Sequence, residues 1–528
     1  MAARRTVGRR EGAVTPPRSA PRGATLADLV RDLPGAQVLG DPATRVRDVR
    51  HDSREVEPGD LFVARRGQRD DGARYVGDAI ARGAAAVIAE DALRVAVPTV
   101  IVPDAELALA RASSHVWAHP TWTLDVLGIT GTNGKTTTAW LLEHALARTG
   151  ARPGLLGTVQ HRFGATTWPA QHTTPEADDL ARRFGAMRDL GATHAVMEVS
   201  SHAIALKRVA AVRFRVAALT NITQDHLDFH GTFERYAATK ASLFTEMGPG
   251  ASVLNVDDPS GARIAASVRD AITYSARGAV ATLRVTRGGA HAHGIDATVE
   301  TPDGEIPLRS PLRGAHNVEN LLAALGVLGA LEIPWDRAAE ALADATGAPG
   351  RLERVTTRAG REDFDVLVDY AHTDDALARV LGTLRTTTRG RIVCVFGCGG
   401  DRDRAKRPRM GEAVGRGADI AIVTTDNPRT EDPARIAEDA AEGVRRAGMV
   451  EVASRAPGAG EFIVTLDRRE AIALAVALAE PGDVVLIAGK GHETYQEVHG
   501  VRSPFDDRAE AANALELRLA RDGGSGEG

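Results

Sequence analysis

Residues 128–138, with the sequence GITGTNGKTTT, combine a glycine-rich turn with a lysine and several hydroxyl side chains. An apolar run precedes them and an amphipathic pattern follows, which predicts a strand, a loop and a helix in that order. The backbone N–H groups of such a loop can bind a phosphate chain. Lys135 would reach the terminal phosphates, and the Thr136 hydroxyl would coordinate Mg²⁺. The spacing departs by one position from the general P-loop pattern, because Ile129 stands five residues before Gly134.

Further candidate metal ligands follow two other predicted strands. Glu198 lies at the end of the run HAVMEVS (194–200). The stretch TNITQDHLDFHGT then gathers acids and histidines behind the next run: Asp225, His226, Asp228 and His230. Mg²⁺ prefers oxygen ligands, so a histidine in its site would be unusual. From the residues alone, Glu198 as a solvated rim charge and each histidine as a structural residue remain open.

Apolar runs alternate with helical patterns along most of the chain, which predicts parallel sheets in doubly wound α/β domains. Of the 528 residues, the first 24 carry six arginines and one acid, and we expect them to form a disordered basic extension. Three α/β domains follow in series. The expected boundaries are 1–24 for the extension, 25–121 for the first domain, 122–349 for the central domain and 350–520 for the last.

The composition is that of an ordinary soluble protein. The formal net charge is −5, which gives no global reason to expect nucleic acid or anionic membranes as partners. No stretch approaches the roughly 20 apolar residues of a membrane span. The two cysteines, Cys394 and Cys398, are too few for a disulfide framework or a metal site, so we expect them in a buried strand and turn of a cytoplasmic protein.

Five stretches occur together in one order: GTNGKT, EVSSH, QDHLDFHGT, HNVENLLAA (316–324) and DYAHT (369–373). With them the chain resembles the Mur ligases, the ATP-dependent amide-forming enzymes of peptidoglycan precursor synthesis, from about residue 45 to 510. The resemblance implies a three-domain architecture, with a central P-loop ATPase-like parallel sheet and a Rossmann-like C-terminal domain. It also places the enzyme in cell-wall biogenesis, and hence in cell shape and division.

The resemblance implies ATP and two Mg²⁺ ions as cofactors. The matching ATP contacts are Gly131, Thr132, Asn133, Gly134, Lys135, Thr136, Thr137, Asn317 and Asp369. The matching metal ligands are Thr136, Glu198, His226 and Lys240, of which the last three join Lys135 as implied catalytic residues. Read alone, Lys240 is an exposed helix lysine. In the family the matching lysine is carbamylated, and a neutral lysine amine can react with CO₂ to give an anionic oxygen ligand.

The N-terminal stretch HDSREVEPGDLFVARRGQRDDG resembles the UDP-binding domain of the family member that adds the third peptide residue. The implied contacts to UDP-N-acetylmuramoyl dipeptide are Ser53, Gln68, Arg69, Asp70, Thr173, Thr174, Ser200 and Arg208. The chain departs from the family at two nearby positions. His172 stands where asparagine is usual, and Leu206 stands where a polar residue is common.

The stretch TTDNPRTEDP (424–433) resembles the recognition motif of members that add meso-diaminopimelate. That amino acid has one carboxylate more than lysine, and an arginine offers a planar bidentate donor for it. The implied contacts are Arg402, Asp426, Asn427, Pro428, Arg429, Gly489 and Glu493. Glu493 could take an ammonium group.

The resemblance implies a reaction in which ATP phosphorylates the γ-carboxylate of D-glutamate and the amine of diaminopimelate attacks the acyl phosphate. We expect a monomer whose partners are these small molecules, with no nucleic acid and no membrane insertion. Three alternatives stay open at this point. The chain could add L-lysine, be a folylpolyglutamate-type relative, or be a P-loop switch that uses ATP for conformational work.

Overall fold

The computed structural model describes residues 20–67, 71–168, 170, 172–291, 293–357, 360, 362–453 and 456–524. Three predicted contacts lie outside the described residues: Gln68, Arg69 and Asp70. Residues 1–19 of the expected extension also lie outside them. Residues next to that extension belong to the folded part: the backbone N–H of Arg22 donates to the Val116 carbonyl at 2.9 Å.

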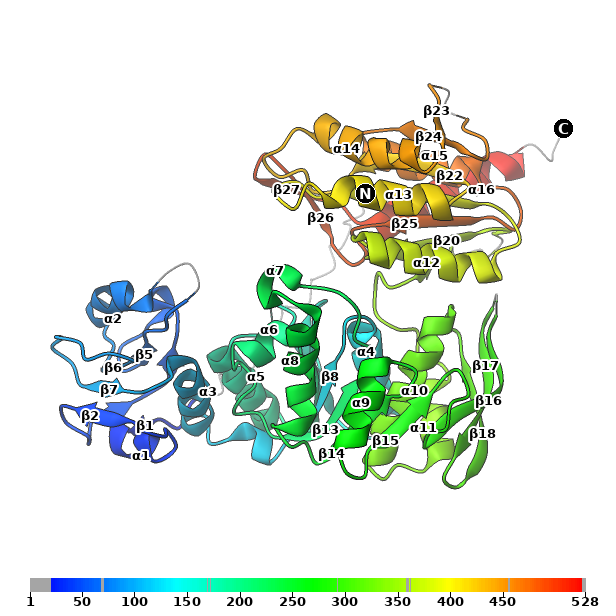
Figure 1. The fold of residues 1–528 in the computed structure, drawn as a ribbon. Helices are drawn as coiled ribbons and strands as arrows, with labels where there is room; N and C mark the ends of the chain where they lie inside the picture. Colours follow the sequence, from blue (N-terminus) through cyan, green and yellow to red (C-terminus); the bar gives the residue numbers. More distant parts are fainter. Residues whose placement is uncertain are drawn as a thin grey trace, which may run out of the picture. The chain divides into compact units, whose positions relative to one another are not determined.

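The chain forms two compact units. Unit 1 consists of the described parts of Met1–Thr130, Gly150–Ala217 and His226–Gly250, and unit 2 of Gly131–Thr149, Ala218–Asp225 and the described parts of Ala251–Gly528. Strand β13 (Phe214–Leu219) therefore begins in unit 1 and has its last two residues in unit 2. Figure 1 shows the elements of both units.

The first part of unit 1 is a five-stranded sheet of order β2-β7-β6-β5-β4, parallel except for β2. Leucines and alanines of α1 and α3 pack on one face, and Val76 and Ala79 of α2 pack on the other. The bounds are α1 (Leu26–Arg31), β2 (Gln37–Leu39), β4 (Val49–Arg50), β5 (Leu61–Val63), α2 (Val76–Ala81), β6 (Ala86–Ala89), β7 (Thr99–Ile101) and α3 (Ala105–Val116). Short elements complete it: β1 (Ala24–Thr25), β3 (Arg45–Val46), η1 (Ser53–Glu55), η2 (Gly72–Tyr75) and η3 (Pro120–Trp122).

The second part of unit 1 has β8 and β9 on the two sides of β12, all parallel, with β10 and β11 added antiparallel beyond β9. Buried Val, Leu and Ile residues fill β8 and β12, as expected for strands covered on both faces. The bounds are β8 (Asp125–Thr130), β9 (Pro153–Leu156), β10 (His161–Phe163), β11 (Thr166–Trp168), α5 (Ala177–Asp189), β12 (His194–Glu198), α6 (Ser201–Ala205), α7 (Leu227–His230) and α8 (Phe233–Thr245).

Unit 2 continues with the helix that follows the glycine-rich loop and with strands β14 and β15, which are parallel. Strands β16, β17 and β18 then form an antiparallel meander that the expectation of parallel sheets does not include. The bounds are α4 (Lys135–Arg148), β14 (Ala251–Asn255), α9 (Pro259–Ser267), β15 (Ile272–Ser275), β16 (Leu283–His291), β17 (Gly294–Thr301), β18 (Gly304–Ser310), α10 (Ala315–Ala330) and α11 (Trp335–Leu342).

The C-terminal part of unit 2 is a seven-stranded sheet of order β19-β20-β25-β21-β22-β24-β23, parallel except for β19. Alternate residues of each strand enter different cores: Leu367 packs with residues of α12, α13 and α14, whereas Val366 and Val368 pack with residues of α15 and α16. The sheet thus lies between two helical layers (Figure 1).

The bounds of the helices and strands in this part place the apolar runs IVCVFG, IAIVTT and VVLIA in β21, β22 and β25. They are β19 (Glu353–Val355), β20 (Asp365–Asp369), α12 (Asp374–Thr387), β21 (Ile392–Cys398), α13 (Lys406–Gly417), β22 (Ile420–Thr425), α14 (Pro433–Arg446), β23 (Val450–Glu451), β24 (Glu461–Val464), α15 (Arg468–Leu478), β25 (Val484–Ala488), β26 (Tyr495–Val498), β27 (Val501–Pro504) and α16 (Asp507–Gly524). Cys394 and Cys398 are free and buried in β21, as predicted.

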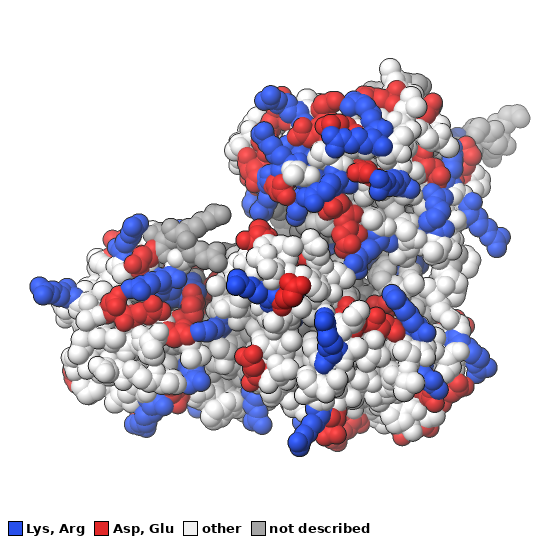
Figure 2. All heavy atoms as spheres, viewed as in Figure 1, with Lys and Arg blue, Asp and Glu red and all other residues white. Residues whose placement is uncertain are grey.

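Basic and acidic side chains are interspersed over the face that Figure 2 presents. Many of the arginines in the C-terminal part are paired with acids, for example Arg445 with Glu438 and Glu451. Within the described residues, no helix combines the length and the apolar character needed to cross a bilayer.

Candidate active site

The glycine-rich loop of unit 2 is held by the segment that follows β13. The Thr132 backbone N–H donates to the Asn221 carbonyl at 2.7 Å, and the Asn133 N–H donates to Oδ1 of Asn221 at 3.0 Å. The Thr220 hydroxyl donates to the Asn133 carbonyl at 2.5 Å. In addition, Oγ1 of Thr132 accepts from the Thr223 N–H at 2.9 Å. The loop is thus fixed mainly through backbone groups.

Two glycines in this loop cannot be replaced without strain. Gly131 has φ +145°, and a Cβ there would lie 1.9 Å from Oγ1 of Thr220. Gly134 has φ +87°, and its Cβ would lie 2.3 Å from Oδ1 of Asn320. A left-handed backbone and close neighbours both require glycine. The conformation leaves a cradle at the N-terminus of α4, where backbone N–H groups favour an anion.

Lys135 is the first residue of α4, directly after the cradle. Its Nζ donates to the carbonyls of Gly131 and Thr132, both at 2.9 Å, so the ammonium lies across the loop. Thr136 and Thr137 follow on the first turn of the helix and are buried. The predicted phosphate contacts 131–137 are therefore contiguous in space as well as in sequence.

The predicted ATP contacts Asn317 and Asp369, which lie outside the loop, make hydrogen bonds within the protein. Asn317 donates to the Arg313 carbonyl at 2.7 Å and accepts from Nδ2 of Asn320 at 2.8 Å. The carboxylate of Asp369 accepts from the backbone N–H groups of Leu352 at 2.7 Å and Ala371 at 2.8 Å. Burial raises the pKa of Asp369 even though Arg351 and these hydrogen bonds oppose the rise. Their nucleotide-binding roles stay predictions.

Asn320 was missing from the sequence-based predictions. Its Oδ1 accepts from the Thr138 hydroxyl at 3.4 Å and lies against Gly134. The residue joins α10 to the start of α4 and so positions the loop beside the predicted Asn317 contact. Its signal in the sequence was its place one helical turn after Asn317, in the same stretch HNVENLLAA.

In unit 1, Glu198 is the last residue of β12 and is only 1% exposed. One carboxylate oxygen accepts from the Thr158 backbone N–H at 2.7 Å, and the other accepts from the Thr158 hydroxyl at 3.1 Å. Its register partner in β8 is Ile129, two residues before Gly131 along the chain. The interpretation of Glu198 as a solvated rim charge is wrong, because the carboxylate is buried.

Lys240 lies on α8 and is 1% exposed. The interpretation of Lys240 as an exposed helix lysine is therefore wrong. Its Nζ donates to Oγ1 of Thr130 at 3.4 Å, and it lies 5.0 Å from the ring centroid of Tyr236. Thr130 is the last residue of β8, directly before the glycine-rich loop. Burying an ammonium group is costly unless hydrogen bonds or opposite charge offset it.

Histidines gather around Tyr236. His226 has φ +52° and is the N-cap residue of α7, and its ring centroid lies 4.8 Å from that of His202 and 6.3 Å from that of Tyr236. His230 shares a hydrogen bond of 3.0 Å with the Ser201 hydroxyl. Burial lowers the pKa of His230, and the nearby His202 and Lys240 lower it further. His202 was not predicted, although it lies in the quoted stretch EVSSH.

The predicted muramoyl-peptide contacts meet at the start of α5 and α6. Oγ1 of Thr174 donates to the Glu198 carbonyl at 2.8 Å and accepts from the Ser200 N–H at 3.0 Å. Arg208 donates to the Thr174 carbonyl at 3.1 Å and pairs with Glu176 at 2.5 Å. Nε of Arg208 is buried without a hydrogen bond among the described residues.

Arg65 was missed by the sequence-based prediction. Its Nη1 lies 2.9 Å from Glu106 and 2.9 Å from Glu176, so Arg65 and Arg208 share Glu176. This places a second half-buried guanidinium beside the predicted contacts. Arg65 is hard to single out in the sequence, because it stands next to Arg66 in a basic run.

Ser53 is buried at the start of η1, two residues after His51. Nδ1 of His51 lies 2.9 Å from Oδ1 of Asp178 on α5. Burial opposes protonation of His51, but the hydrogen bond and charge of Asp178 outweigh it and raise the pKa of the imidazole. The segment that carries Ser53 is thereby tied to the helix that follows Thr174.

The remaining positions of this group are peripheral. The hydroxyl of Thr173 lies 3.1 Å from that of Thr158, which also contacts Glu198. His172 is exposed, and the pKa of its imidazole is lowered by partial burial and by the charge of Arg208. Leu206 is the C-cap residue of α6. The effect of these two departures on substrate contacts stays open to experiment.

In the C-terminal sheet, the predicted amino-acid contacts follow the carboxyl ends of β21, β22 and β25. Arg429 has φ +52°, and its guanidinium donates to the Gly400 carbonyl. A Cβ at Gly399 would lie 3.4 Å from Nη1 of Arg429 and 3.8 Å from Cγ of Arg402, so these two predicted arginines flank one glycine turn. Pro428 contacts the same turn, with its carbonyl 1.9 Å from a Cβ built at Gly400.

Asp426, Asn427 and Glu493 surround Lys490, a residue that was not among the predicted contacts. Lys490 is fully buried, and its Nζ donates to Oδ1 of Asn427 at 2.9 Å and to the Tyr495 carbonyl at 2.7 Å. It also pairs with Asp426 at 3.3 Å and with Glu493 at 3.6 Å. Asn427 in turn donates to Oε2 of Glu493 at 2.8 Å.

A buried ion pair lies behind this group. Arg468 and Asp507 are both 0% exposed and join at 2.7 Å through two parallel hydrogen bonds. Arg468 also donates to the carbonyls of Ala488 at 2.9 Å and Thr425 at 3.2 Å. These are the last residues of β25 and β22, so the pair fixes the two strand ends that carry Gly489 and Asp426.

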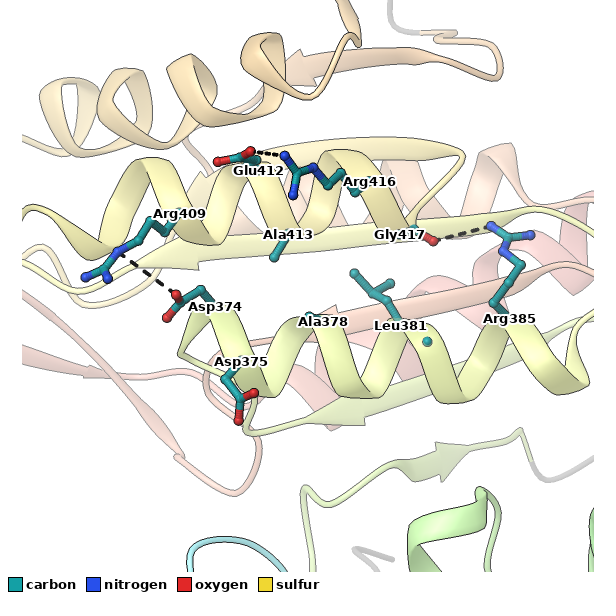
Figure 3. Close-up of a pocket in the computed structure, with 11 residues that line it drawn as sticks. Asp374, Asp375, Ala378, Leu381, Arg385, Arg409, Glu412, Ala413, Arg416 and Gly417 are labelled. Carbon is teal, nitrogen blue, oxygen red and sulfur yellow. Dashed lines mark hydrogen bonds and ion pairs between the residues drawn. The ribbon is translucent and has the colours of Figure 1, made fainter. Parts of the chain in front are cut away.

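A groove of about 630 Å³ opens between α12 and α13 (Figure 3). Its floor is formed by small and apolar side chains such as Ala378, Leu381 and Ala413. The rim arginines are already paired with acids of the same domain: Arg385 with Asp419, Arg409 with Asp374 and Arg416 with Glu412. None of the predicted contacts lines this groove.

The donors present suit an Mg²⁺–nucleotide ligand. Thr136 in unit 2 and Glu198 in unit 1 each offer the oxygen atoms that a hard cation prefers, and the N-terminus of α4 offers backbone N–H groups for an anion. The nitrogen donors of His226 suit Mg²⁺ less well. A carboxylated Lys240 would add oxygen ligands, whereas an unmodified ammonium would not.

The sequence matches three family models in order: the Mur ligase family catalytic domain over residues 45–117, the Mur ligase middle domain over 129–328, and the Mur ligase glutamate ligase domain over 350–491. The chain belongs to the Mur ligase family. The predicted α/β fold class and the order of its parts are confirmed, while the boundary residues stay predictions.

Several individual relatives within this family carry the same enzyme name. The chain is 45% identical over 509 residues to the UDP-N-acetylmuramoyl-L-alanyl-D-glutamate–2,6-diaminopimelate ligase of Geobacter metallireducens, covering 93% of this chain and 98% of that one. It is 44% identical to the enzyme of the same name from Streptomyces coelicolor, with 95% and 98% covered. A solved structure of an enzyme with that name is 32% identical, with a TM-score of 0.68 and 94% and 99% covered.

Proposed function

We propose that this chain is the ATP-dependent ligase that joins meso-diaminopimelate to the D-glutamate of UDP-N-acetylmuramoyl-L-alanyl-D-glutamate. The observation that carries the proposal is similarity over nearly the whole length of both chains to enzymes named for this reaction. The DNPR stretch and the group around Asn427 and Glu493 support the choice of amino acid, because they offer both a guanidinium and carboxylates.

In the proposed reaction, an oxygen of the D-glutamate γ-carboxylate attacks the terminal phosphorus of ATP, and ADP leaves. The amine of diaminopimelate then attacks the acyl carbon, loses a proton and expels phosphate. Lys135 and the backbone N–H groups at the N-terminus of α4 offset negative charge where two anionic reactants meet, and the fixed loop holds them in place without reorganisation.

Thr136, Glu198 and His226 are the residues that would hold Mg²⁺, together with a carbamate on Lys240. Bound Mg²⁺ would supply Lewis-acid stabilisation of charge on the phosphate oxygens. The buried position of Glu198, fixed by two hydrogen bonds from Thr158, keeps one carboxylate rotamer without help from the cation.

Carbamylation of Lys240 is supported by its burial and its position next to Thr130. Intact mass measured at neutral pH should show the mass of one CO₂ added to the protein, and that mass should be lost in Lys240→Ala. The alanine variant should be inactive and partly rescued by a short added carboxylate. An active alanine variant together with an unmodified lysine would refute the carbamate.

The dipeptide substrate would bind at Thr173, Thr174, Ser200 and Arg208, with the uridine diphosphate near Ser53 and the predicted turn Gln68–Asp70. Arg208 has an unused buried Nε that can donate to a substrate carboxylate. Arg65 stands on the other side of Glu176 and makes this region more positive.

The test is amide formation with a panel of amino acids, measured as ADP release and product mass. We expect rapid ligation of meso-diaminopimelate that requires both ATP and the UDP-muramoyl dipeptide. Preference for L-lysine would replace the amino acid in the proposal. ATP turnover that needs no UDP-sugar would favour the conformational ATPase instead.

We propose a cytoplasmic location, because the proposed substrates are ATP and a UDP-activated precursor. We also propose a monomer, because one chain carries all of the predicted contacts. Light scattering of the purified protein with and without substrates would measure the mass. A stable dimer would overturn the monomer proposal without affecting the reaction.

A further inference from the structure

The side chain of Lys490 has no role in the predicted set of diaminopimelate contacts, although it lies between Gly489 and Glu493 in the sequence. It is the most enclosed cation of the group, with 0% exposure. An ammonium buried to this extent must be offset by hydrogen bonds and opposite charge. Lys490 meets both needs through residues that the proposed function assigns to the amino-acid substrate: Asp426, Asn427 and Glu493.

The hydrogen bonds of Lys490 set the orientation of the Asn427 amide. Oδ1 of Asn427 accepts from Nζ of Lys490 at 2.9 Å and from the Glu497 backbone N–H at 3.0 Å. With both donors on Oδ1, the NH₂ group must face the other way, and it donates to Glu493 at 2.8 Å. The alternative amide orientation would place NH₂ against two donors.

The same ammonium lies within 3.6 Å of two carboxylates, Asp426 and Glu493. Two carboxylates close together resist being ionised at once unless a cation is present. Oδ1 of Asp426 is buried and makes no hydrogen bond among the described residues. An acceptor with an ion pair but no hydrogen bond can still accept from a ligand N–H group.

We propose that Lys490 is a positioning residue of the amino-acid site, which offsets the charge of Asp426 and Glu493 and holds Asn427 in one orientation, so that together they receive an ammonium group of the substrate. This inference rests on the proposed function. With two carboxylates and one lysine, the group retains one net negative charge. That charge complements an amino-acid ammonium, while Arg429 remains available for a carboxylate.

Other titratable groups face this position and belong to the argument. Tyr370 and Tyr495 border it, with Nζ of Lys490 5.7 Å from the Tyr495 ring centroid, and Arg502 covers that ring at 4.5 Å. Arg468 lies behind Gly489 and is neutralised by Asp507 at 2.7 Å. Among the described residues, Lys490 is thus the cation in direct contact with both carboxylates.

The experiment compares wild type with Lys490→Met and Lys490→Gln in steady-state kinetics from pH 6 to 9. The methionine removes the charge and the hydrogen bonds at similar volume, and the glutamine removes the charge but keeps a donor. At pH 7 we expect KM for diaminopimelate to rise about tenfold to a hundredfold in Lys490→Met. KM for ATP and for the UDP-muramoyl dipeptide should stay within about threefold.

The pH profile separates positioning from structural support. Without the ammonium, one of the two carboxylates takes up a proton as the pH falls, so the KM defect of both variants should grow toward pH 6 and shrink toward pH 9. Arg391→Met is the matched control. Arg391 pairs with Asp483 at 2.7 Å, and these residues directly precede β21 and β25, at the strand ends opposite to those that carry the site. This variant should lower stability and leave KM for diaminopimelate and its pH profile unchanged.

An unchanged KM in Lys490→Met, or an equal and pH-independent rise in KM for all three substrates, would overturn the proposal. If Lys490→Met does not fold, the same two outcomes are decided with Lys490→Gln. Failure of the proposed function looks different, because the wild-type enzyme would then fail to ligate diaminopimelate at any pH.

Discussion

The glycine-rich loop and the proposed amino-acid site both lie in unit 2, and both contain charged groups, but the first is formed mainly by backbone and the second by side chains. The loop is shaped by backbone hydrogen bonds and by two glycines that no other residue can replace without strain. The amino-acid site is shaped by side chains, several of them charged and buried, that neutralise each other around Lys490. A phosphate chain needs only N–H donors and positive charge. A zwitterionic amino acid needs opposite charges at separate places, and only side chains can supply them.

The largest effect is expected when the loop loses its one charged side chain. Lys135→Ala should lower kcat by about 10² to 10³ while the fold is retained, because the ammonium that is removed donates to carbonyls of the loop itself. Single-turnover ligation would measure the loss, and circular dichroism would check the fold. Ligation at a rate near that of wild type would remove ATP chemistry from this loop.

A smaller but still large effect should follow from a change that adds only one methyl group. Gly131→Ala places a Cβ 1.9 Å from Oγ1 of Thr220, so the loop must shift, and a displacement of about 1 Å can cost about 10² in rate. Gly150→Ala is the matched control, since Gly150 also has positive φ but open space around it. That control should cost stability alone, and equal kinetic losses in both variants would contradict a backbone-built loop.

The amino-acid site should lose selectivity before it loses all activity. Arg429→Ala leaves a substrate carboxylate without its partner, which costs of order 1–3 kcal/mol, or about tenfold to a hundredfold in kcat/KM for diaminopimelate. The small activity with L-lysine should fall much less. Both amino acids must be measured with both proteins. An equal loss for the two would show that Arg429 supports the turn at Gly400 rather than binding the carboxylate.

The smallest effect is expected for the pair His51–Asp178, which lies outside both the loop and the proposed amino-acid site. Its loss measures the contribution of such a pair to the free energy of unfolding. Asp178 raises the pKa of His51, so the pair stabilises unit 1 fully below about pH 6.5 and loses this contribution as the pH rises through the folded-state pKa. His51→Gln should lower Tm at pH 6 by the equivalent of about 1 kcal/mol and have little effect at pH 9.

The control for that pair is His144→Gln. His144 lies 2.8 Å from Asp344, but both side chains are more than a third exposed, so little stability should depend on them. A Tm difference for His51→Gln that does not change between pH 6 and 9 would mean that packing rather than charge is lost.

The parts of the fold and of the site that could be predicted are those whose contacting residues lie close together in the sequence. The loop 131–137 is contiguous, and its glycines and lysine announce a strand, a turn and a helix, so both its structure and its ligand could be predicted. The contacts that hold the loop in place could not be predicted, because they depend on how strands and helices pack. They come from the segment Thr220–Thr223 and from Asn320 beside Gly134. The antiparallel meander was missed, although TPDGE at 301–305 is a hairpin signal between alternating residues.

Lys490 shows the same limit within a predicted site. The motif resemblance named its neighbours Gly489 and Glu493, yet the lysine itself reads in the sequence as one more cation after a strand. Only the fold brings Asn427, 63 positions away, onto its ammonium. Burial was equally invisible for Lys240, whose helix carries polar residues on both sides in sequence but turns this one inward.

The two cysteines have a practical consequence. Burial raises the pKa of both Cys394 and Cys398 to about 12, and the thiolate is the form that reacts with alkylating reagents. At neutral pH the native protein should therefore resist such reagents until the sheet around β21 opens. Because the chain has no other thiol, the rate of alkylation would report on opening of the C-terminal domain alone. Substrates that close or rigidify that domain should then be detectable by the protection they give, without any label being introduced.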